Sequence, residues 1–140
     1  MRTIAFYFYF FGYLLCSIPL LNKIKKRKET TLSVEEQDRL DHVFPKKWAK
    51  TLVKISGADV TVIGEENIPA GPVLFVANHE GNFDIPILLS GLKKPFGFIS
   101  KIEVTKIPIV HKWMEVMNCV FMDRKDRRQS IKAIRQGIEE

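Results

Sequence analysis

The longest apolar pattern in the chain lies at its start. Residues 4–21 carry no charged side chain, and as a helix they would be about 27 Å long, enough to cross the hydrocarbon core of a membrane. Pro19 would kink or end this helix. A basic cluster follows at residues 23–28, which by the positive-inside rule places the rest of the chain in the cytoplasm. We therefore predict a hydrophobic membrane anchor with a basic flank over residues 1–28, whether it spans the membrane, re-enters it or lies on its surface.

The pattern then becomes polar, with a helical period over residues 30–43. Ser33 and Glu36 have the spacing of a capping box, which predicts a helix that begins next to Ser33. We expect His42 at the surface or at an interface. The helix should break at Pro45, because a proline inside a helix removes a hydrogen bond and clashes with the preceding turn.

A second helix is predicted over residues 45–56, with Gly57 as its cap. Its apolar positions share one face, which is expected to pack on a sheet: Trp48, Leu52 and Ile55. Residues 29–57 are therefore predicted to be a helical lead-in to the domain that follows.

From residue 58 onward, short apolar runs alternate with helical patterns. The apolar runs predict strands at residues 58–63, 73–77, 96–100 and 118–122. Helical patterns lie at residues 85–89, at residues 102–117 with an interruption at Pro108, and in a last helix capped by Ser130. Strands that alternate with helices predict an α/β fold, here a mixed β-sheet flanked by helices and preceded by the membrane helix.

The most informative turn follows the run at residues 73–77. Five positions separate His79 from Asp84, which on a regular helix would place the two side chains about 140° apart. They can meet only if the backbone between them is not helical, and Gly81 is a residue that tolerates such a turn. The pattern therefore allows a histidine and a carboxylate to meet across a tight turn.

The helix after this turn should start near residues 83–85, because Pro86 is confined to the first helical turn. Asp84 would then lie in that first turn, and His79 at the carboxyl end of a strand, where open α/β sheets bind ligands. The structural alternative is that His79 is an ordinary turn histidine and Asp84 a helix N-cap.

Composition narrows the possible partners. The 140 residues carry a net charge of +6, which favours anionic partners such as nucleic acid or a membrane, and the apolar N-terminus favours the membrane. The basic cluster lacks the interleaved aromatic residues that stack on bases, so no nucleic acid partner is expected. The two cysteines, Cys16 and Cys119, are too few for a disulfide framework and lack the company of metal ligands.

The residues around the turn resemble a known family. Asn78-His79-x-x-x-x-Asp84 after a valine-rich run resembles the first motif of the glycerolipid acyltransferases, specifically the 1-acylglycerol-3-phosphate acyltransferase family. The preceding residues 64–72 are similar to that family's approach to the motif. Residues 100–108 resemble its K-x-E-L-x-x-I-P segment, and residues 120–124 its second motif. The similarity covers about residues 45–140 in the family's order and spacing.

Three positions depart from the family pattern, which often has serine or threonine at Gly81 and glycine at His111 and Asn118. The family's third motif, E-G-T-R, does not occur in this sequence. Residues 58–140 are therefore expected to be the N-terminal part of the acyltransferase α/β domain.

The resemblance implies transfer of a fatty acyl group from a thioester to the sn-2 hydroxyl of 1-acylglycerol-3-phosphate, giving phosphatidate. An alcohol is a poor nucleophile until a base removes its proton, and His79 is the candidate base. Asp84 would orient its ring, as the acid does in a Ser-His-Asp triad. Arg124, and more weakly Lys101, would bind the substrate phosphate.

Further roles follow from the same resemblance. Asn78 and Gly81 would support the motif. The acyl donor would be an acyl-CoA or acyl carrier protein thioester, with no cofactor and no metal. The partners would be lysophosphatidate, the acyl donor and membrane lipids, together with acyl carrier protein where it carries the acyl group. The catalytic part would lie on the cytoplasmic face of the cell membrane.

Two alternative functions stay open. The chain could be a catalytically incompetent fragment that acts only as a membrane-associated module. It could also be an acyltransferase that acts on a different lysophospholipid or on glycerol 3-phosphate.

Overall fold

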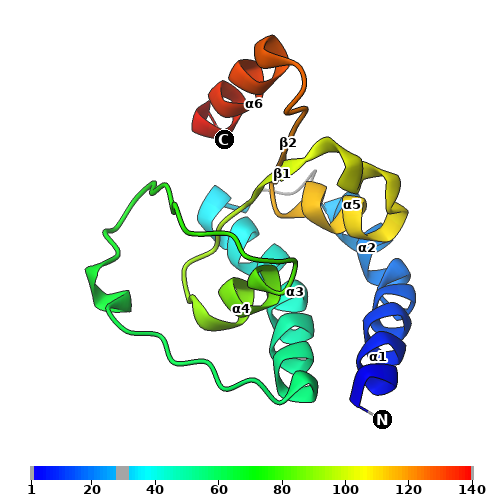
Figure 1. Cartoon of the computed structure of the whole chain (residues 1–140). Helices are drawn as coiled ribbons and strands as arrows, with labels where there is room; N and C mark the ends of the chain where they lie inside the picture. Colours follow the sequence, from blue (N-terminus) through cyan, green and yellow to red (C-terminus); the bar gives the residue numbers. More distant parts are fainter. Residues whose placement is uncertain (1, 28–31, 140) are drawn as a thin grey trace.

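The computed structural model describes residues 2–27 and 32–139 and is mainly helical (Figure 1). Lys28 of the predicted basic flank lies outside the described residues, as do residues 30–31 of the predicted polar helix. The elements in chain order are α1 (Arg2–Cys16), α2 (Ile18–Arg27), α3 (Val34–Ser56), η1 (Glu65–Asn67), α4 (Asp84–Gly91), β1 (Ile99–Lys101), η2 (Ile102–Lys106), α5 (Pro108–Val116), β2 (Val120–Met122) and α6 (Arg127–Glu139).

The apolar N-terminus forms two helices that meet at Ser17. Pro19 lies in the first turn of α2, as its fixed φ and missing N–H require. Ser17 is buried, its hydroxyl donates to the Leu14 carbonyl at 2.5 Å, and it accepts the indole N–H of Trp113 at 2.8 Å. The break between α1 and α2 is therefore built into the protein core. By length and hydropathy, residues 2–25 could also cross a membrane.

One face of α1 packs along α3 in the antiparallel direction (Figure 1). The rings of Phe10 and Trp48 lie 5.2 Å apart, and those of Tyr13 and Phe44 lie 4.6 Å apart. At the far end, the Arg2 side chain lies against Gly57. The predicted division of the chain at residues 28 and 57 stays a prediction, but the helices on both sides of residue 28 share one core: Leu14, Leu21, Ile24, Trp113 and Val116.

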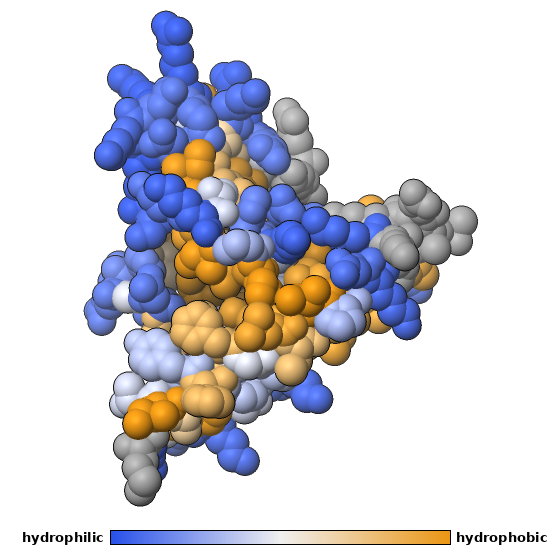
Figure 2. Space-filling model, turned by 90° about the vertical axis from the view of Figure 1, so that its right-hand side faces the viewer, coloured by the Kyte–Doolittle hydropathy of each residue, from blue (hydrophilic) through white to orange (hydrophobic). Residues whose placement is uncertain are grey.

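The opposite face of α1 is apolar and exposed. It carries Ile4, Phe8, Phe11 and Leu15, and Phe8 is 81% exposed. Figure 2 shows apolar side chains gathered over the lower and middle part of this face of the molecule, where α1 and α2 lie. The helix is thus apolar on two sides, and only one of them is covered by the protein.

Helix α3 begins and ends as the sequence predicts. The Ser33 hydroxyl accepts the Glu36 amide at 3.3 Å and the Glu36 carboxylate accepts the Ser33 amide, which completes the capping box. Gly57 closes the helix with φ 78°, a left-handed conformation that favours glycine. The predicted break at Pro45 is wrong, since α3 runs through it. Pro45 is buried, and packing on both sides of it offsets the hydrogen bond that it cannot make.

His42 is buried with 3% exposure, so its predicted place at the surface is wrong. Its Nδ1 lies 2.7 Å from the Asp38 carbonyl oxygen. Its Nε2 lies 2.9 Å from the Phe96 carbonyl oxygen and 3.2 Å from the Phe96 amide nitrogen. The imidazole therefore fastens α3 to the segment that leads into β1.

The sheet found among the described residues has two parallel strands. Ile99 of β1 lies opposite Val120 of β2, and Lys101 lies opposite Met122. Helix α5 forms the crossover between them, packed with α3 and α4 around a second apolar cluster: Ala49, Leu89, Met114, Met117 and Cys119. The α/β class is confirmed as helices with a small parallel sheet, whereas the predicted mixed sheet is not formed.

The predicted strands at residues 58–63 and 73–77 are wrong. Figure 1 shows residues 58–82 as a wide loop that leaves the body after α3 and returns at α4. Several of its apolar side chains are exposed, and Val76 is 86% exposed. A strand exists only where a second backbone accepts and donates its hydrogen bonds. An apolar run indicates that its side chains favour burial, but it does not show that a second backbone is available to pair with it.

Two lysines after α4 fasten this loop. The Lys93 amide donates to the Glu65 carboxylate at 2.5 Å, and the Lys93 ammonium lies 3.0 Å from it. These contacts hold the pKa of the Glu65 carboxyl below its ordinary value, mainly through the backbone hydrogen bond. Lys94 donates to the carbonyls of Pro69, at 2.8 Å, and Gly71. The loop is therefore anchored near η1, although its apolar runs are unpaired.

The last helix is capped by a different residue from the one predicted. The Asp126 carboxylate accepts the amides of Arg128 and Gln129 at 2.9 and 3.2 Å, so α6 begins at Arg127. The Ser130 hydroxyl instead donates to the Asp123 carbonyl at 2.7 Å. Aspartate and serine are both good caps, and here the aspartate lies earlier in the chain.

The contact between Ser17 and Trp113 gives a stability prediction. Ser17→Ala leaves the buried indole N–H of Trp113 without an acceptor, so we expect the free energy of unfolding to fall by about 1–3 kcal/mol. Urea denaturation followed by Trp fluorescence measures this difference. Thr3→Ala removes an exposed hydroxyl from α1 and should have little effect. Equal stability of the two variants would contradict the prediction.

Candidate active site

The structure brings His79 and Asp84 together across the predicted turn. One carboxylate oxygen of Asp84, Oδ2, lies 2.7 Å from Nδ1 of His79. The same oxygen accepts the backbone amides of Glu80 at 2.9 Å and Gly81 at 3.1 Å. In return, the Asp84 amide donates to the Gly81 carbonyl at 3.1 Å. Asp84 is the first residue of α4, so the start of that helix fixes the turn.

These hydrogen bonds set the charge of the site. The backbone amide of Gly81, then that of Glu80, and to a smaller extent His79 hold the pKa of the Asp84 carboxyl below its ordinary value. An ionised carboxylate only accepts hydrogen bonds, so Nδ1 of His79 must carry the hydrogen. In the neutral imidazole, the other ring nitrogen, Nε2, then has a free lone pair. Because the His79 side chain is 61% exposed, this nitrogen is open to a proton donor.

The structure corrects the predicted reason for Gly81. The described glycines with positive φ are Gly57, Gly64 and Gly71, so Gly81 does not use the left-handed region. No atom lies within 4 Å of where its Cβ would be. The turn is therefore shaped by the Asp84 carboxylate and not by the backbone freedom of glycine. Asn78 is exposed, and none of the described hydrogen bonds connects its side chain to the pair.

The two predicted phosphate ligands lie at a shared edge of the sheet. Lys101 ends β1 opposite Met122, and Arg124 follows β2 by two residues, so both follow the carboxyl ends of parallel strands. Both side chains are exposed. The loop that carries Arg124 is held by Gln129, which accepts the Asp123 amide at 2.6 Å. Among the described residues, no hydrogen bond or ion pair joins this edge to the histidine turn.

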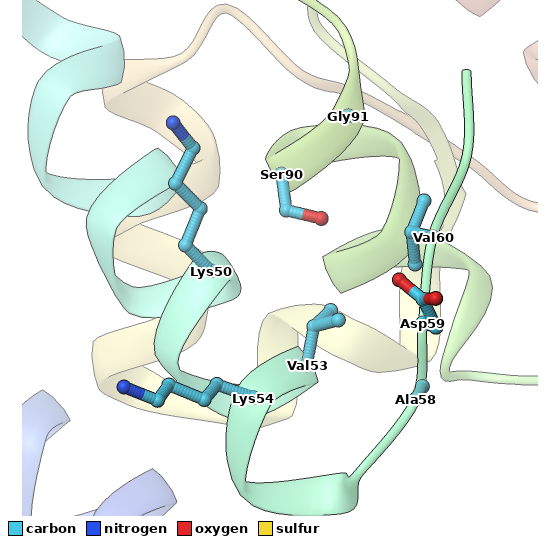
Figure 3. A pocket seen from close by; sticks show the side chains of 8 residues that line it. All are labelled: Lys50, Val53, Lys54, Ala58, Asp59, Val60, Ser90 and Gly91. Atoms are coloured by element: carbon cyan, nitrogen blue, oxygen red, sulfur yellow. The ribbon is translucent and has the colours of Figure 1, made fainter. Parts of the chain in front are cut away.

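Two hollows of the surface lie away from these residues. One, of about 310 Å³, is lined by the end of α3, residues 58–60 and the end of α4. Figure 3 shows the Ser90 hydroxyl near its centre and the Lys54 ammonium pointing away from it. The other, of about 400 Å³, lies along the wide loop between Gly64 and Phe75. Neither contains His79, Asp84, Lys101 or Arg124. Among the described residues, no three His, Cys, Asp or Glu side chains are grouped to hold a metal ion.

Sequence reasoning missed two contributors to the turn. The backbone amides of Glu80 and Gly81 carry no signal in their side chains, so only coordinates could reveal them. The second is Phe83, the N-cap residue of α4, whose ring lies 6.1 Å from that of Phe6 in α1. A phenylalanine in an apolar run gives no indication of such a distant contact.

Comparisons with known proteins agree with the motif resemblance. A family model described as Acyltransferase matches residues 59–140. A 1-acyl-sn-glycerol-3-phosphate acyltransferase of Chlamydomonas reinhardtii is 34% identical over 139 residues, which cover 97% of this chain and 40% of the relative. A probable enzyme of the same name from Mycoplasma pneumoniae is 39% identical over 59% of this chain and 32% of its own length.

A third relative, the 1-acyl-sn-glycerol-3-phosphate acyltransferase of Saccharomyces cerevisiae, is 30% identical over 59% of this chain and 27% of its own length. The chain therefore spans less than half the length of the curated relatives that it matches. No solved structure matches the chain.

The lowered pKa of the Asp84 carboxyl leads us to expect that the hydrogen bonds of the turn depend on pH. Its folded-state pKa is depressed, so its hydrogen bonds are fully present above the ordinary carboxyl pKa of about 3.9 and are lost as the pH falls through the lower, folded-state value. We expect the Glu80 and Gly81 amides to exchange hydrogen faster in Asp84→Asn than in the wild type at pH 6, with the difference vanishing in acid. Amide exchange followed by NMR measures this. Asp59→Asn, at an exposed aspartate outside the turn, is the control, and a difference that persists in strong acid would refute the assignment.

Proposed function

The chain belongs to the acyltransferase family, and on this premise we propose that it transfers a fatty acyl group from a thioester to the sn-2 hydroxyl of 1-acylglycerol-3-phosphate. The product would be phosphatidate. The observation that carries the proposal is the His79–Asp84 pair, with Nδ1 of the imidazole on the carboxylate at 2.7 Å. The names of the relatives, which state the same acceptor, support it.

The geometry supplies the proton transfer that this reaction needs. Nε2 of His79 takes the proton of the substrate hydroxyl, whose oxygen then forms a bond to the thioester carbonyl carbon. The tetrahedral intermediate collapses as the carbon–sulfur bond breaks, and the proton on Nε2 passes to the departing thiolate. Asp84 stabilises the imidazolium that exists between these two transfers. The substrate hydroxyl takes the place of a serine nucleophile, so no acyl-enzyme forms.

The acceptor phosphate needs fixed positive charge. We assign it to Arg124, whose guanidinium can bind two phosphate oxygens at once, with Lys101 as a weaker ligand. Their common position after the carboxyl ends of β1 and β2 supports this assignment. Asn78 and Gly81 are proposed to support the motif around His79. The donor is proposed to be an acyl-CoA or acyl carrier protein thioester.

We further propose that the chain works at the cytoplasmic face of a membrane. The exposed apolar face of α1, which includes Phe8 and Phe11, suits the acyl region of a bilayer. Lys23 and Lys25 follow in α2 and suit anionic headgroups. The opposite face of α1 is packed on the protein, so an α1 that lies along the membrane surface keeps both sides covered. Lysophosphatidate has an acyl chain and would meet the site from this bilayer.

A second candidate is a membrane-associated module without activity. The unpaired run at residues 73–77, directly before His79, favours it, because no sheet holds that end of the turn in place. The acyl acceptor could also be another lysophospholipid or glycerol 3-phosphate. Acyl transfer by the purified chain, measured with each acceptor in turn, separates these candidates.

Removal of the base tests the proposed chemistry. We expect His79→Ala to lower the rate of acyl transfer to lysophosphatidate by roughly 100-fold or more, because general base catalysis contributes that much. Radiolabelled acyl transfer in mixed micelles measures the rate. Asn82→Ala changes an exposed side chain in the same turn and should retain activity. Wild-type rates in His79→Ala would exclude His79 as the base.

The proposed role of Arg124 in phosphate binding is tested by comparing the KM for the acceptor with the KM for the donor. We expect Arg124→Ala to raise the KM for lysophosphatidate about tenfold or more, because a charge-assisted contact to the phosphate is lost. The KM for the acyl donor should not change. Lys125→Ala removes the neighbouring exposed cation and serves as the matched control. If both variants raise KM equally, the effect is one of general surface charge and Arg124 is not a specific ligand.

A further inference from the structure

Helix α1 has two apolar stripes on opposite sides. Ile4, Phe8, Phe11 and Leu15 form the outer stripe and are all exposed. Phe6, Phe10 and Leu14 form the inner stripe, which is partly or fully buried. Phe6 and Phe8 are two positions apart and so point about 160° away from each other on a helix. The inner stripe packs against the rest of the protein, so contact with a membrane does not explain why it is apolar.

The inner stripe reaches the turn that holds His79 and Asp84. The ring of Phe6 lies 6.1 Å from the ring of Phe83 at an interplanar angle of 46°. Phe83 is the N-cap residue of α4 and is bonded directly to Asp84, and its carbonyl accepts the Ile87 amide at 3.3 Å. Phe6 therefore contacts the residue immediately before the first residue of α4.

Phe6 is itself held in place by a row of rings. It stacks with Phe10 at 6.3 Å, and Phe10 packs with Trp48 of α3 at 5.2 Å. The row Trp48–Phe10–Phe6–Phe83 joins α3, α1 and the start of α4. Aromatic pairs at these separations are favourable beyond the area they bury.

The rest of the turn has little packing of its own. His79, Glu80 and Asn82 are exposed, as are the residues from Leu74 to Asn78 that precede them. Hydrogen bonds to Asp84 close the turn. Among the described residues of the turn, Phe83 makes the aromatic contact, with the ring of Phe6. The turn is therefore held against the body from two sides, by this contact and by α4, which packs on α3 with Leu89 and Ala49 in one buried cluster.

We propose that Phe6 is a positioning residue. Through Phe83 it holds the start of α4, and so keeps the Asp84 carboxylate within hydrogen-bond distance of His79. The helix with the lipid-facing stripe is thereby also a wall of the site. The proposal rests on the proposed function for its catalytic consequence, but its structural consequence can be measured without activity.

Phe6→Ala in the full chain is the test, with Phe8→Ala as the matched control on the opposite face of the same helix. We expect the Glu80 and Gly81 amides to exchange about two- to tenfold faster in Phe6→Ala, in line with loss of one aromatic contact, and at the wild-type rate in Phe8→Ala. Flotation with vesicles of phosphatidylcholine and phosphatidylglycerol should show the reverse, with binding weakened in Phe8→Ala and retained in Phe6→Ala.

Phe6→Leu separates positioning from loss of fold, because it keeps an apolar side chain of useful size at the same place. We expect intermediate exchange rates in this variant, together with a kcat between those of Phe6→Ala and the wild type at an unchanged KM. Wild-type exchange of both amides in a folded Phe6→Ala chain would overturn the proposal. If the wild type transfers no acyl group, the proposed function fails, and the exchange rates still decide the role of Phe6.

Discussion

The turn at residues 79–84 depends on the single carboxylate oxygen of Asp84 that accepts three N–H groups. It collects the imidazole of His79 and the amides of Glu80 and Gly81, which would otherwise face solvent separately. A turn closed by a side-chain acceptor needs no left-handed backbone, and none of its described residues uses one. Because Asp84 also begins α4, its charge lies at the helix end where free amides and the helix dipole favour an anion. One ionised group at the start of α4 thus shapes the turn and places a hydrogen on Nδ1 of His79.

Local signals in the sequence predicted local structure well. The capping box at Ser33, the cap at Gly57 and the start of α4 near Pro86 each depend on residues within one helical turn, and the structure has all three. The meeting of His79 and Asp84 follows from the motif resemblance, since their spacing says only that no regular helix can lie between them if they meet. The interruption before α5 at Pro108 follows from the same local chemistry.

Features that depend on distant partners were not predictable from the same patterns. The apolar run at residues 73–77 indicates a strand, but the pairing backbone lies elsewhere in sequence and the run is unpaired. Pro45 breaks an isolated helix, yet packing from other helices overrides that tendency. His42 was expected at the surface or at an interface, and the structure excludes the surface. Its burial depends on backbone groups of Phe96, 54 positions away. For Pro45 and His42 a tertiary contact overrides the local preference, whereas the run at residues 73–77 lacks the pairing that its preference needs.

The N-terminal helix shows why hydropathy alone cannot say what covers an apolar segment. A count of apolar residues treats Phe6 and Phe8 alike, although Phe6 lies against Phe83 and Phe8 is exposed. Ser17 distinguishes the two environments. Its hydroxyl donates to the Leu14 carbonyl of the preceding turn, a bond that a helix in lipid could also make. It also accepts the indole N–H of Trp113 in a buried site, and only the folded protein supplies that partner. The polar residue in the apolar run therefore marks the side that belongs to the protein. In the proposed function the opposite stripe, which is exposed, faces the lipid. One helix could then serve both the membrane and the turn because its two stripes lie on different sides.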